Sequence, residues 1–385
     1  MASITMTVYI QDAVRTPRGK ARPNGALAGE TPHGLVTHLV DALEKRGADP
    51  RSVDQFTLGC VGQVGAQGGG LAMVTKMAAA LPDESVVHTL NNFCASGLSA
   101  IGLAANAIVA GQADRALAGG VEMMSRVPFM ADHADYYGDQ AFAPQRRYIP
   151  VGLAADLLAE SEGVSRAEMD AAAERSQRLA AEAEARPAYQ ASRIAVAGLD
   201  REEPVRPTTI ESLAALPHAF TAWGTEYAAA LSKPAVHSHT VAHAPPIVDG
   251  AGLAVISGDP SDARARVVTY AESGGDPRAS LTAGFAAMDK ALARAGMVLD
   301  DIDRIEFMEA FAVTIAKFMR DRSVDQDRVN VSGGHLAKGH PMGATGAILT
   351  STLLDVLDAD DKRFGMVVCT GAQGVGAAMI VERLA

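Results

Sequence analysis

The sequence has little of several features that define other protein classes. Its 385 residues include three cysteines, Cys60, Cys94 and Cys369, which cannot all pair within one chain. Lys and Arg number 34 against 45 Asp and Glu, and the formal net charge of −11 disfavours a general polyanion-binding surface, so no nucleic-acid partner is expected. No signal peptide and no apolar run of transmembrane length is recognised, so we expect no membrane span and a reducing cytoplasm as the location.

The chain is rich in hydrophobic residues. Hydrophobic residues make up 48% of the sequence and charged residues 21%, which is enough to bury large cores. The length favours two or more domains, although barrels of this size exist as single domains.

An internal duplication is the strongest organisational signal. The segment 42–56, ALEKRGADPRSVDQF, matches the segment 291–305, ALARAGMVLDDIDRI, without a gap. Each combines a helix end, a glycine break and the start of an apolar strand. Two further correspondences follow in order: 88–102 with 335–357, and 115–125 with 365–382. Three ordered matches predict two copies of one α/β unit around a mixed or parallel sheet.

The chain between the copies differs in character. Residues 126–245 are richer in aromatic and charged side chains, and SRAEMDAAAERSQRLAAEAEAR at 165–186 predicts a polar helix. We expect this segment to cover a site, since loops on a rigid scaffold commonly supply substrate contacts. A surface elaboration without a role is the alternative.

Cys94 lies in HTLNNFCASGLSAIG, directly before an Ala/Ile/Leu run of helical spacing. A thiol at the first turn of a helix has its pKa lowered by unpaired N–H groups, so it is expected to tend towards thiolate. The alternative is a small buried hydrophobic side chain.

Two more reactive groups come from the second copy. His340 stands between Gly339 and Pro341 in a glycine-rich turn, and Cys369 ends an apolar strand before TGAQGVG. Each has an ordinary alternative, a hydrogen-bonded turn histidine and a buried cysteine. If a pseudo-twofold axis brings equivalent turns together, Cys94, His340 and Cys369 converge as a nucleophile and base set for acyl transfer.

The sequence resembles the thiolase family over nearly its whole length. The motifs are AVRTPRGK at 13–20, NNFCASG around Cys94, AGGVEMMS at 118–125, RPTTIESLAALPHAF at 206–220, DGAG at 249–252, MEAFA at 308–312, GGHLAKGHPMGATG at 333–346 and CTGAQG at 369–374.

The resemblance implies an α/β thiolase fold, with two duplicated βαβαβαββ core domains in a five-layered αβαβα arrangement plus a loop domain. The implied divisions are an N-terminal core of 1–118 with 246–262, a loop domain of 119–245 that binds CoA and substrate, and a C-terminal core of 263–385. It also implies a homodimer or a homotetramer built as a dimer of dimers, and it leaves room for a partner subunit of β-oxidation.

The resemblance also implies a mechanism, in which each catalytic residue of the family has a matching position in this chain. The residue matching Cys94 takes the acyl group, the one matching His340 removes its proton, and the one matching Cys369 exchanges a proton with the substrate's α-carbon. An oxyanion hole of main-chain N–H groups maps to Cys94 and Gly371. Acyl-CoA and CoA are the implied substrates, with no metal and no bound cofactor.

The chain departs from the family where Asn-Glu-Ala-Phe or His-Glu-Ala-Phe is usual. Here the run is Met308, Glu309, Ala310 and Phe311, and a thioether is only a weak acceptor for the water that the usual residue holds. The function that the resemblance implies is thiolytic cleavage of a 3-ketoacyl-CoA by CoA, or the reverse Claisen condensation, through an acyl group on Cys94. Because of Met308, the alternative is a weakly active or non-catalytic CoA-thioester-binding subunit of a complex. A decarboxylating ketosynthase is a further rival, but such relatives lack the Cys369 base.

Weaker expectations concern the CoA contacts. Arg206 and Ser212 match the segment along the CoA nucleotide and pantetheine, and Pro245 replaces a serine that contacts pantetheine. His335 is unusual beside the paired glycines, and we hypothesise that it supplies the polar group that Met308 does not. The run HSHTVAH at 237–243 suggests a metal site, but no Cys or acidic cluster joins it in sequence, so none is expected. The acyl group and the preferred direction stay open.

Overall fold

The computed structural model describes residues 7–278 and 280–384. Its strands form one connected sheet in the order β4-β3-β5-β6-β1-β7-β10-β9-β8, with β2 beside β6. The strands are β1 Val8–Arg15, β2 Gly19–Lys20, β3 Gln55–Gly59, β4 Val86–Leu90, β5 Arg115–Met123, β6 Val248–Ser257, β7 Ala265–Gly274, β8 Arg304–Phe307, β9 Phe364–Gly371 and β10 Val375–Arg383. The main helices are α1 Pro32–Lys45, α2 Leu71–Ala78, α3 Ser96–Val109, α4 Val151–Glu162, α5 Arg166–Glu184, α6 Ile210–Ala214, α7 Thr221–Glu226, α8 Ala283–Ala295, α9 Ala312–Asp321, α10 His335–Lys338 and α11 Thr345–Ala359.

The two halves of the sheet repeat one strand pattern. In the first half β3 is parallel to β5, while β5 with β6 and β6 with β1 are antiparallel. In the second half β8 is parallel to β9, while β9 with β10 and β10 with β7 are antiparallel. The halves join where β1 pairs with β7 through residues 8–10. This repeat is the structural counterpart of the internal sequence matches. The place of β4 beside β3 is taken in the second half by a single parallel bridge between Val329 and Ile305 of β8.

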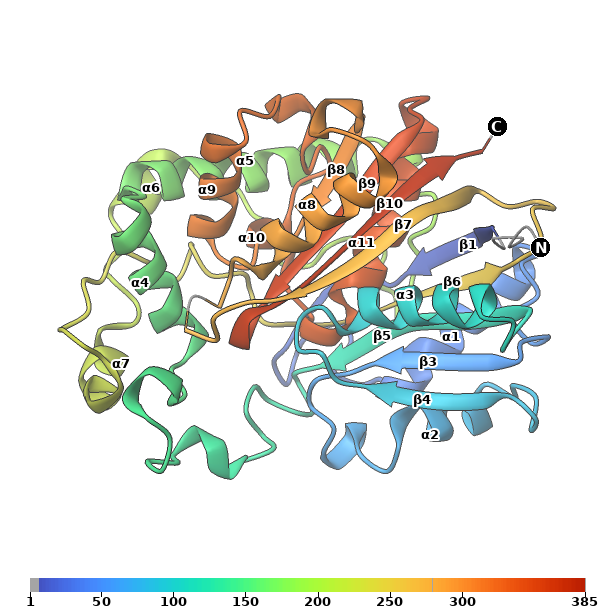
Figure 1. The fold of residues 1–385 in the computed structure, drawn as a ribbon, viewed down its shortest axis with the longest axis horizontal. Coiled ribbons are helices and arrows are strands. Elements are labelled where there is room, and N and C mark those ends of the chain that lie inside the picture. Colours follow the sequence, from blue (N-terminus) through green and yellow to red (C-terminus); the bar gives the residue numbers. More distant parts are fainter. Residues whose placement is uncertain (1–6, 279, 385) are drawn as a thin grey trace.

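Helices lie in three layers around the two halves of the sheet (Figure 1). Helices α1 and α2 pack on the outer face of the first half, and α8 packs on β7, β9 and β10 of the second. Helices α3 and α11 lie between the halves, where α11 contacts β1 and β6 as well as β8 and β9. The expected five-layered α/β thiolase fold is therefore confirmed.

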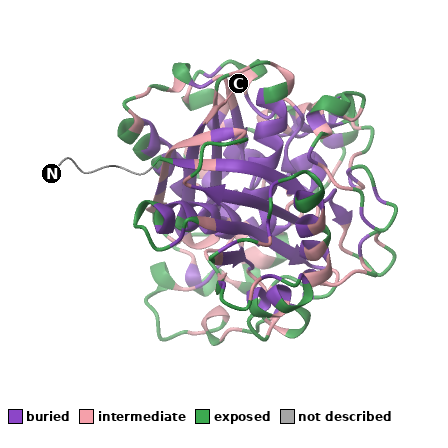
Figure 2. Ribbon diagram, turned by 90° about the vertical axis from the view of Figure 1, so that its right-hand side faces the viewer, coloured by how far each residue is buried: buried purple, intermediate pink, exposed green. Residues whose placement is uncertain are grey.

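Sequence pattern explains which helices lie outside and which lie inside. Helix α1 buries Leu35, Val36, Leu39, Val40 and Leu43, a single stripe at helical spacing. Helices α3 and α11 are buried on almost every side, so both are built mainly of small or apolar residues. Figure 2 shows the strands and the central helices as the buried interior, with exposure concentrated in peripheral loops and helices.

Two glycines let the first turns of the central helices touch. A Cβ at Gly97 would lie 2.7 Å from the carbonyl oxygen of Gly343, and one at Gly346 would lie 2.4 Å from the backbone nitrogen of Leu98. Both distances are too short for a side chain, so the contact requires glycine. This approach brings the turn before α3 to the turn before α11, which are equivalent turns of the two copies.

The segment between β5 and β6 carries α4, α5, α6 and α7 and adds no strand to the sheet. The polar helix predicted over 165–186 is confirmed as α5, whose N-cap Ser165 forms a capping box with Glu168. Strand β5 continues to Met123, past the expected boundary at 118. The division of the chain into three domains stays a prediction. Within residues 7–278 and 280–384, no helix has both the length and the apolar character needed to cross a bilayer.

Candidate active site

A cavity of about 200 Å³ lies where the two halves and the inserted segment meet. Five of the residues singled out in the sequence line it: Cys94, Pro245, Met308, Phe311 and His340. Its wall is otherwise mostly apolar, including Phe220 and Trp223, whose rings stack at 5.0 Å. The structure therefore brings together residues that are far apart in the sequence, as the duplication predicts.

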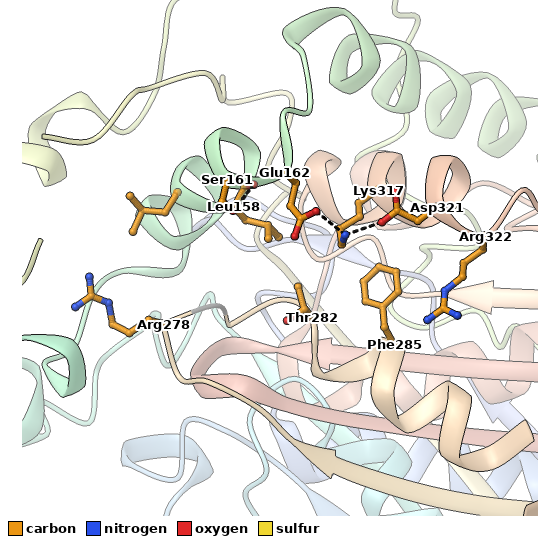
Figure 3. A pocket seen from close by; sticks show the side chains of 10 residues that line it. Leu158, Ser161, Glu162, Arg278, Thr282, Phe285, Lys317, Asp321 and Arg322 are labelled. Atoms are coloured by element: carbon orange, nitrogen blue, oxygen red, sulfur yellow. Dashed lines mark hydrogen bonds and ion pairs between the residues drawn. The ribbon is translucent and has the colours of Figure 1, made fainter. Parts of the chain in front are cut away.

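A larger cavity of about 570 Å³ lies elsewhere, between α4, α8 and α9 (Figure 3). Its lysine, Lys317, is held between the carboxylates of Glu162 and Asp321 at 2.7 and 2.6 Å. Neither cysteine nor histidine is among the described residues that line it. Chemistry rather than size thus identifies the smaller cavity as the candidate site.

Cys94 directly precedes the N-cap of α3 and is half-buried. Burial raises the pKa of its thiol to about 11, although the backbone N–H groups of Ala372 and of Cys94 itself oppose this shift. The expectation of a lowered pKa is therefore wrong for the unliganded protein. The reason is that desolvation of the thiolate outweighs the hydrogen bonds at the start of the helix. Cys94 is a neutral thiol until a base removes its proton.

His340 is positioned to be that base. Its Nδ1 atom is hydrogen-bonded to the hydroxyl of Thr345 at 2.6 Å, while its Nε2 atom has no partner among the described residues. Burial, aided by the charge of Arg18, lowers the pKa of His340 to about 3, so the imidazole is neutral at physiological pH. With the proton on Nδ1, Nε2 carries the free lone pair. Thr345 is a functional residue that sequence reasoning missed, and its place one turn after His340 was the available signal.

Cys369 lies near the end of β9 and is fully buried. Burial and then the neighbouring Cys94 raise the pKa of its thiol, which places the two sulfurs within interaction range. Cys369 is not among the described residues of the cavity wall. Cys369 is therefore a buried neighbour of Cys94 that lies outside the described cavity wall.

The turn after Cys369 passes directly beside the nucleophile. A Cβ at Gly371 would lie 3.0 Å from the Cβ of Cys94, so a side chain is not tolerated there without displacement. The N–H that reaches the Cys94 sulfur belongs to Ala372, one residue beyond the predicted Gly371. Ala372 also lines the cavity and was missed by the sequence analysis. The role of Gly371 in an oxyanion hole stays a prediction.

Met308 and Phe311 form an apolar side of the cavity. The residue between them in the motif, Glu309, is buried and turns away from the cavity to accept hydrogen bonds from Ser176, Asn330 and the backbone N–H of Leu336. These bonds tie the motif to α5 and α10. The motif thus keeps its structural anchor although the polar group at position 308 is absent.

His335 lies against His340, with ring centroids 5.5 Å apart and the rings perpendicular. It is fully buried, and neither ring nitrogen has a hydrogen-bond partner among the described residues. Burial lowers the pKa of His335 well below its ordinary value. His335 is not among the described residues that line the cavity, so the contact it makes is with His340 rather than with the space beside Met308.

A buried ion pair supports the turn that carries His340. Glu202, from the inserted segment, accepts hydrogen bonds from the backbone N–H, Nε and Nη2 of Arg18. Arg18 in turn approaches the carbonyl oxygen of Gly339 at 3.4 Å. Arg18 lowers the pKa of Glu202 to about 2, so the carboxylate stays charged. The motif AVRTPRGK contains Arg18, but nothing in the sequence indicated its partner.

The predicted CoA contacts differ in their placement. Pro245 lines the cavity, whereas Arg206 and Ser212 are exposed outside it. The hydroxyl of Ser212 completes a capping box with Thr209 at the start of α6. Their contacts with CoA stay predictions.

The three histidines of HSHTVAH are engaged with carboxylates. His237 and His239 both bind Asp156, at 2.7 and 2.8 Å, and His243 binds Asp170 at 2.7 Å. These contacts hold the segment 237–243, which precedes β6, against α4 and α5. In the described part of the chain no group of three or more His, Cys, Asp or Glu side chains has an arrangement that could hold a metal ion.

Comparison with known proteins agrees with the geometry. The thiolase N-terminal domain model matches residues 8–257, and the thiolase C-terminal domain model matches residues 261–383. The chain is 33% identical to the 3-ketoacyl-CoA thiolase of Marinobacter nauticus over 98% of both chains. It is also 33% identical to that of Erwinia tasmaniensis, over 98% of this chain and 99% of the other.

A solved structure gives the same answer for the fold. The crystal structure of the Bacillus anthracis acetyl-CoA acetyltransferase aligns over 100% of both chains, with a TM-score of 0.85 and 28% sequence identity. Family models that cover nearly the whole chain, full-length relatives and this structural match lead to one conclusion: the chain belongs to the thiolase family and is a thiolase-type acyltransferase.

Proposed function

We propose that the protein cleaves a 3-ketoacyl-CoA with free CoA, or runs the reverse condensation, through an acyl group carried on Cys94. The observation that carries the proposal is that Cys94 and a neutral His340 line one cavity, with Cys369 within interaction range of Cys94. The relatives from Marinobacter nauticus and Erwinia tasmaniensis, both named 3-ketoacyl-CoA thiolase, support the substrate class.

The protonation states fit the first half of the reaction. His340 Nε2 takes the proton of Cys94, and the sulfur attacks the C3 carbonyl of the substrate. The bond between C2 and C3 breaks, and the electron pair left on C2 takes a proton from Cys369. Since burial raises the pKa of the Cys369 thiol, this group is protonated and ready to donate. Acetyl-CoA leaves, and the remaining acyl group stays on Cys94.

The second half restores the enzyme. Cys369, now a thiolate, takes the proton of the incoming CoA thiol, whose sulfur attacks the acyl carbonyl. Cys94 leaves as thiolate and recovers its proton from His340. The N–H groups of Cys94 and Gly371 are the proposed donors to the carbonyl oxygen as it becomes negatively charged, which would favour the tetrahedral intermediate. The N–H of Ala372, which reaches the Cys94 sulfur, follows that of Gly371 in the chain.

The proposal extends to the setting of the enzyme. CoA enters as a substrate, and no metal or bound cofactor takes part in the steps above. We propose a cytoplasmic homodimer or homotetramer that acts in β-oxidation. The relatives' name, 3-ketoacyl-CoA thiolase, supports the thiolysis step of that proposal. The non-catalytic binding subunit suggested by Met308 has no support among the relatives, which are named as enzymes.

The test is a thiolysis assay with trapping of the intermediate. Purified protein is mixed with a series of 3-ketoacyl-CoA substrates and free CoA, and the loss of 3-ketoacyl-CoA absorbance is followed. We expect cleavage of at least one substrate and, without CoA, an acyl adduct on the Cys94 peptide by mass spectrometry. Absence of both turnover and adduct across the series would favour the binding-subunit function.

A further inference from the structure

A second cavity, of about 170 Å³, adjoins the candidate active site. Both cavities are lined by Val61, Phe93, Phe129, Met342 and Ala372. Phe93 precedes Cys94 in the chain, and the N–H of Ala372 reaches the Cys94 sulfur. The second cavity therefore begins beside the nucleophile, at a place where an acyl group on that sulfur can enter it.

Three tyrosines distinguish this second cavity, which we call the tyrosine chamber: Tyr136, Tyr137 and Tyr148. Tyr148 lies at the centre of the cluster, with its ring centroid 4.7 Å from that of Tyr137 and 6.1 Å from that of Tyr136. Phe142 packs edge-on against Tyr136 at 5.3 Å. Aromatic walls of this kind favour a further ring, because offset and edge-to-face pairs are more stable than burial of area alone predicts.

The hydroxyl groups of the chamber are not equally engaged. Tyr137 donates to the carboxylate of Asp132, at 3.0 Å from both oxygens. Tyr148 is buried and donates to the thioether sulfur of Met130 at 3.3 Å, a weak acceptor that a ligand oxygen can replace. Burial raises the pKa of Tyr148, so its hydroxyl stays protonated as a donor.

Charge in the chamber selects against anions. Asp132 is its acidic residue, and no Lys or Arg occurs among the described residues that line it. A terminal carboxylate on the acyl group would therefore meet like charge and no cation. A hydroxyl on the ligand meets instead the acceptor Asp132 and the donor Tyr148.

Volume sets the size of the ligand. A cavity of about 150 Å³ in another protein holds one benzene molecule. A chamber of about 170 Å³ therefore takes a single six-membered ring, and a long alkyl chain or a fused ring system would have to extend out of it.

We propose that the tyrosine chamber binds the acyl group carried on Cys94 and that this group is an aryl or hydroxyaryl acyl. The proposal rests on the function proposed above and names its substrate class. In thiolysis of 3-oxo-3-phenylpropanoyl-CoA, the bond between C2 and C3 breaks, the benzoyl group stays on Cys94 and C2 takes a proton. The thiol of CoA then takes the benzoyl group, and the products are benzoyl-CoA and acetyl-CoA.

The experiment compares kcat/KM for thiolysis of four substrates: 3-oxo-3-phenylpropanoyl-CoA, acetoacetyl-CoA, 3-oxohexadecanoyl-CoA and 3-oxoadipyl-CoA. We expect the aryl substrate to exceed the long-chain and the carboxylate substrates by about tenfold or more. Preference for either of those two over the aryl substrate would overturn the proposal.

Three variants test whether the aryl group of the substrate binds in the tyrosine chamber. Ala131→Phe fills the chamber, in which Ala131 lies, and is expected to lower kcat/KM for the aryl substrate by about tenfold while acetoacetyl-CoA changes by less than about twofold. Tyr148→Phe, which removes one hydroxyl, should reduce only the preference for a para-hydroxyl substrate. Tyr189→Phe, outside the chamber beside Asp360, is the control. Equal losses on all substrates in Ala131→Phe would contradict the assignment.

A binding measurement separates the two proposals. Benzoyl-CoA and hexadecanoyl-CoA are titrated into Cys94→Ala and into Cys94→Ala with Ala131→Phe by calorimetry. We expect the filled chamber to weaken binding of benzoyl-CoA selectively. If none of the four substrates is cleaved by the wild type but this selectivity is present, the proposed function fails and the assignment of the chamber as a binding site for the aryl group stands. If cleavage occurs without this selectivity, only the chamber assignment fails.

Discussion

The two halves of the molecule share a strand pattern but place different chemistry at equivalent positions. The turn before α3 carries Cys94, and the equivalent turn before α11 carries His340. The strand registers make Gly120 of β5 the counterpart of Cys369 of β9. A Cβ at Gly120 would lie 2.2 Å from the carbonyl oxygen of Gly343, so the first copy keeps glycine where the second copy's turn packs against it, and the second copy carries a reactive thiol there. Two residues further along β5, Glu122 accepts hydrogen bonds from the N–H groups of Val61, Gly62 and Gly343 and so braces the same turn. Duplication has allowed each copy to give up part of the chemistry.

The division of chemistry between the two halves predicts the largest loss of activity when the nucleophile of the first half is removed. Cys94→Ala should lower kcat for thiolysis by about 10⁴-fold or more, because among the described residues that line the cavity Cys94 is the thiol that can carry the acyl intermediate. The matched control is Cys60→Ala, a buried cysteine of the first half that contacts Glu122 and Gln67 instead of the cavity. Turnover is measured by loss of 3-ketoacyl-CoA absorbance. Substantial activity in Cys94→Ala would show that the acyl group does not reside on this sulfur.

A variant at Cys369, in the second half, should affect protonation of C2 more than acyl transfer to Cys94. Cys369→Ala is expected to lower thiolysis by about 10²- to 10⁴-fold, since C2 loses its proton donor. Acyl transfer from benzoyl-CoA or acetyl-CoA onto Cys94 releases CoA, whose thiolate is a far weaker base than the electron pair left on C2. This transfer should therefore be lowered much less than thiolysis, and it can be read by mass spectrometry of the intact protein. Equal loss of both steps would assign Cys369 to nucleophile activation instead.

The hydrogen bond between Thr345 and His340 lies wholly within the second half, so a variant that removes it tests the contribution of that half alone. Thr345→Val removes the hydroxyl that holds Nδ1 at 2.6 Å and should lower kcat by about tenfold with little change in KM. Thr345→Ser restores the hydroxyl and should recover most of the rate. If Ser and Val behave alike, packing rather than the hydrogen bond explains the effect.

The smallest expected effect concerns His335 and acid stability. Its pKa is lowered in the folded protein, so below the unfolded pKa of about 6.5 the unfolded state binds the extra proton and folding stability falls with pH. His335→Leu should therefore reduce the loss of unfolding free energy between pH 7 and pH 4 by on the order of 1–3 kcal/mol. His88→Leu, at an exposed histidine, serves as the control in urea titrations at both pH values. An unchanged pH dependence in His335→Leu would mean that the imidazole is solvated.

The sequence predicted the parts of the fold that periodicity and duplication encode. Helix α5 was predicted from the polar, helix-forming composition of residues 165–186, and the convergence of the Cys94 and His340 turns followed from the internal matches. These features are local, or they repeat a local pattern.

What the sequence did not predict depends on burial and on long-range partners. The pKa of Cys94 was expected to be lowered by the helix start, but the site is dry enough to raise it. The hydrogen bond from Thr345 to His340 and the salt bridge between Arg18 and Glu202 need three-dimensional placement, since no spacing rule links residues 18 and 202. The tyrosine chamber likewise appears only once Phe93 and Tyr148 are placed in one cavity wall.

The salt bridge between Arg18 and Glu202 limits how this enzyme can be re-engineered by exchange of segments between relatives. A graft that replaced the inserted segment and omitted Glu202 would leave a guanidinium without its counter-ion in the protein interior, at a cost of about 3–5 kcal/mol. The same change would loosen the turn of Gly339 just before His340. A chimera that takes its inserted segment from a relative must therefore keep an acidic residue at position 202, or replace both Arg18 and Glu202.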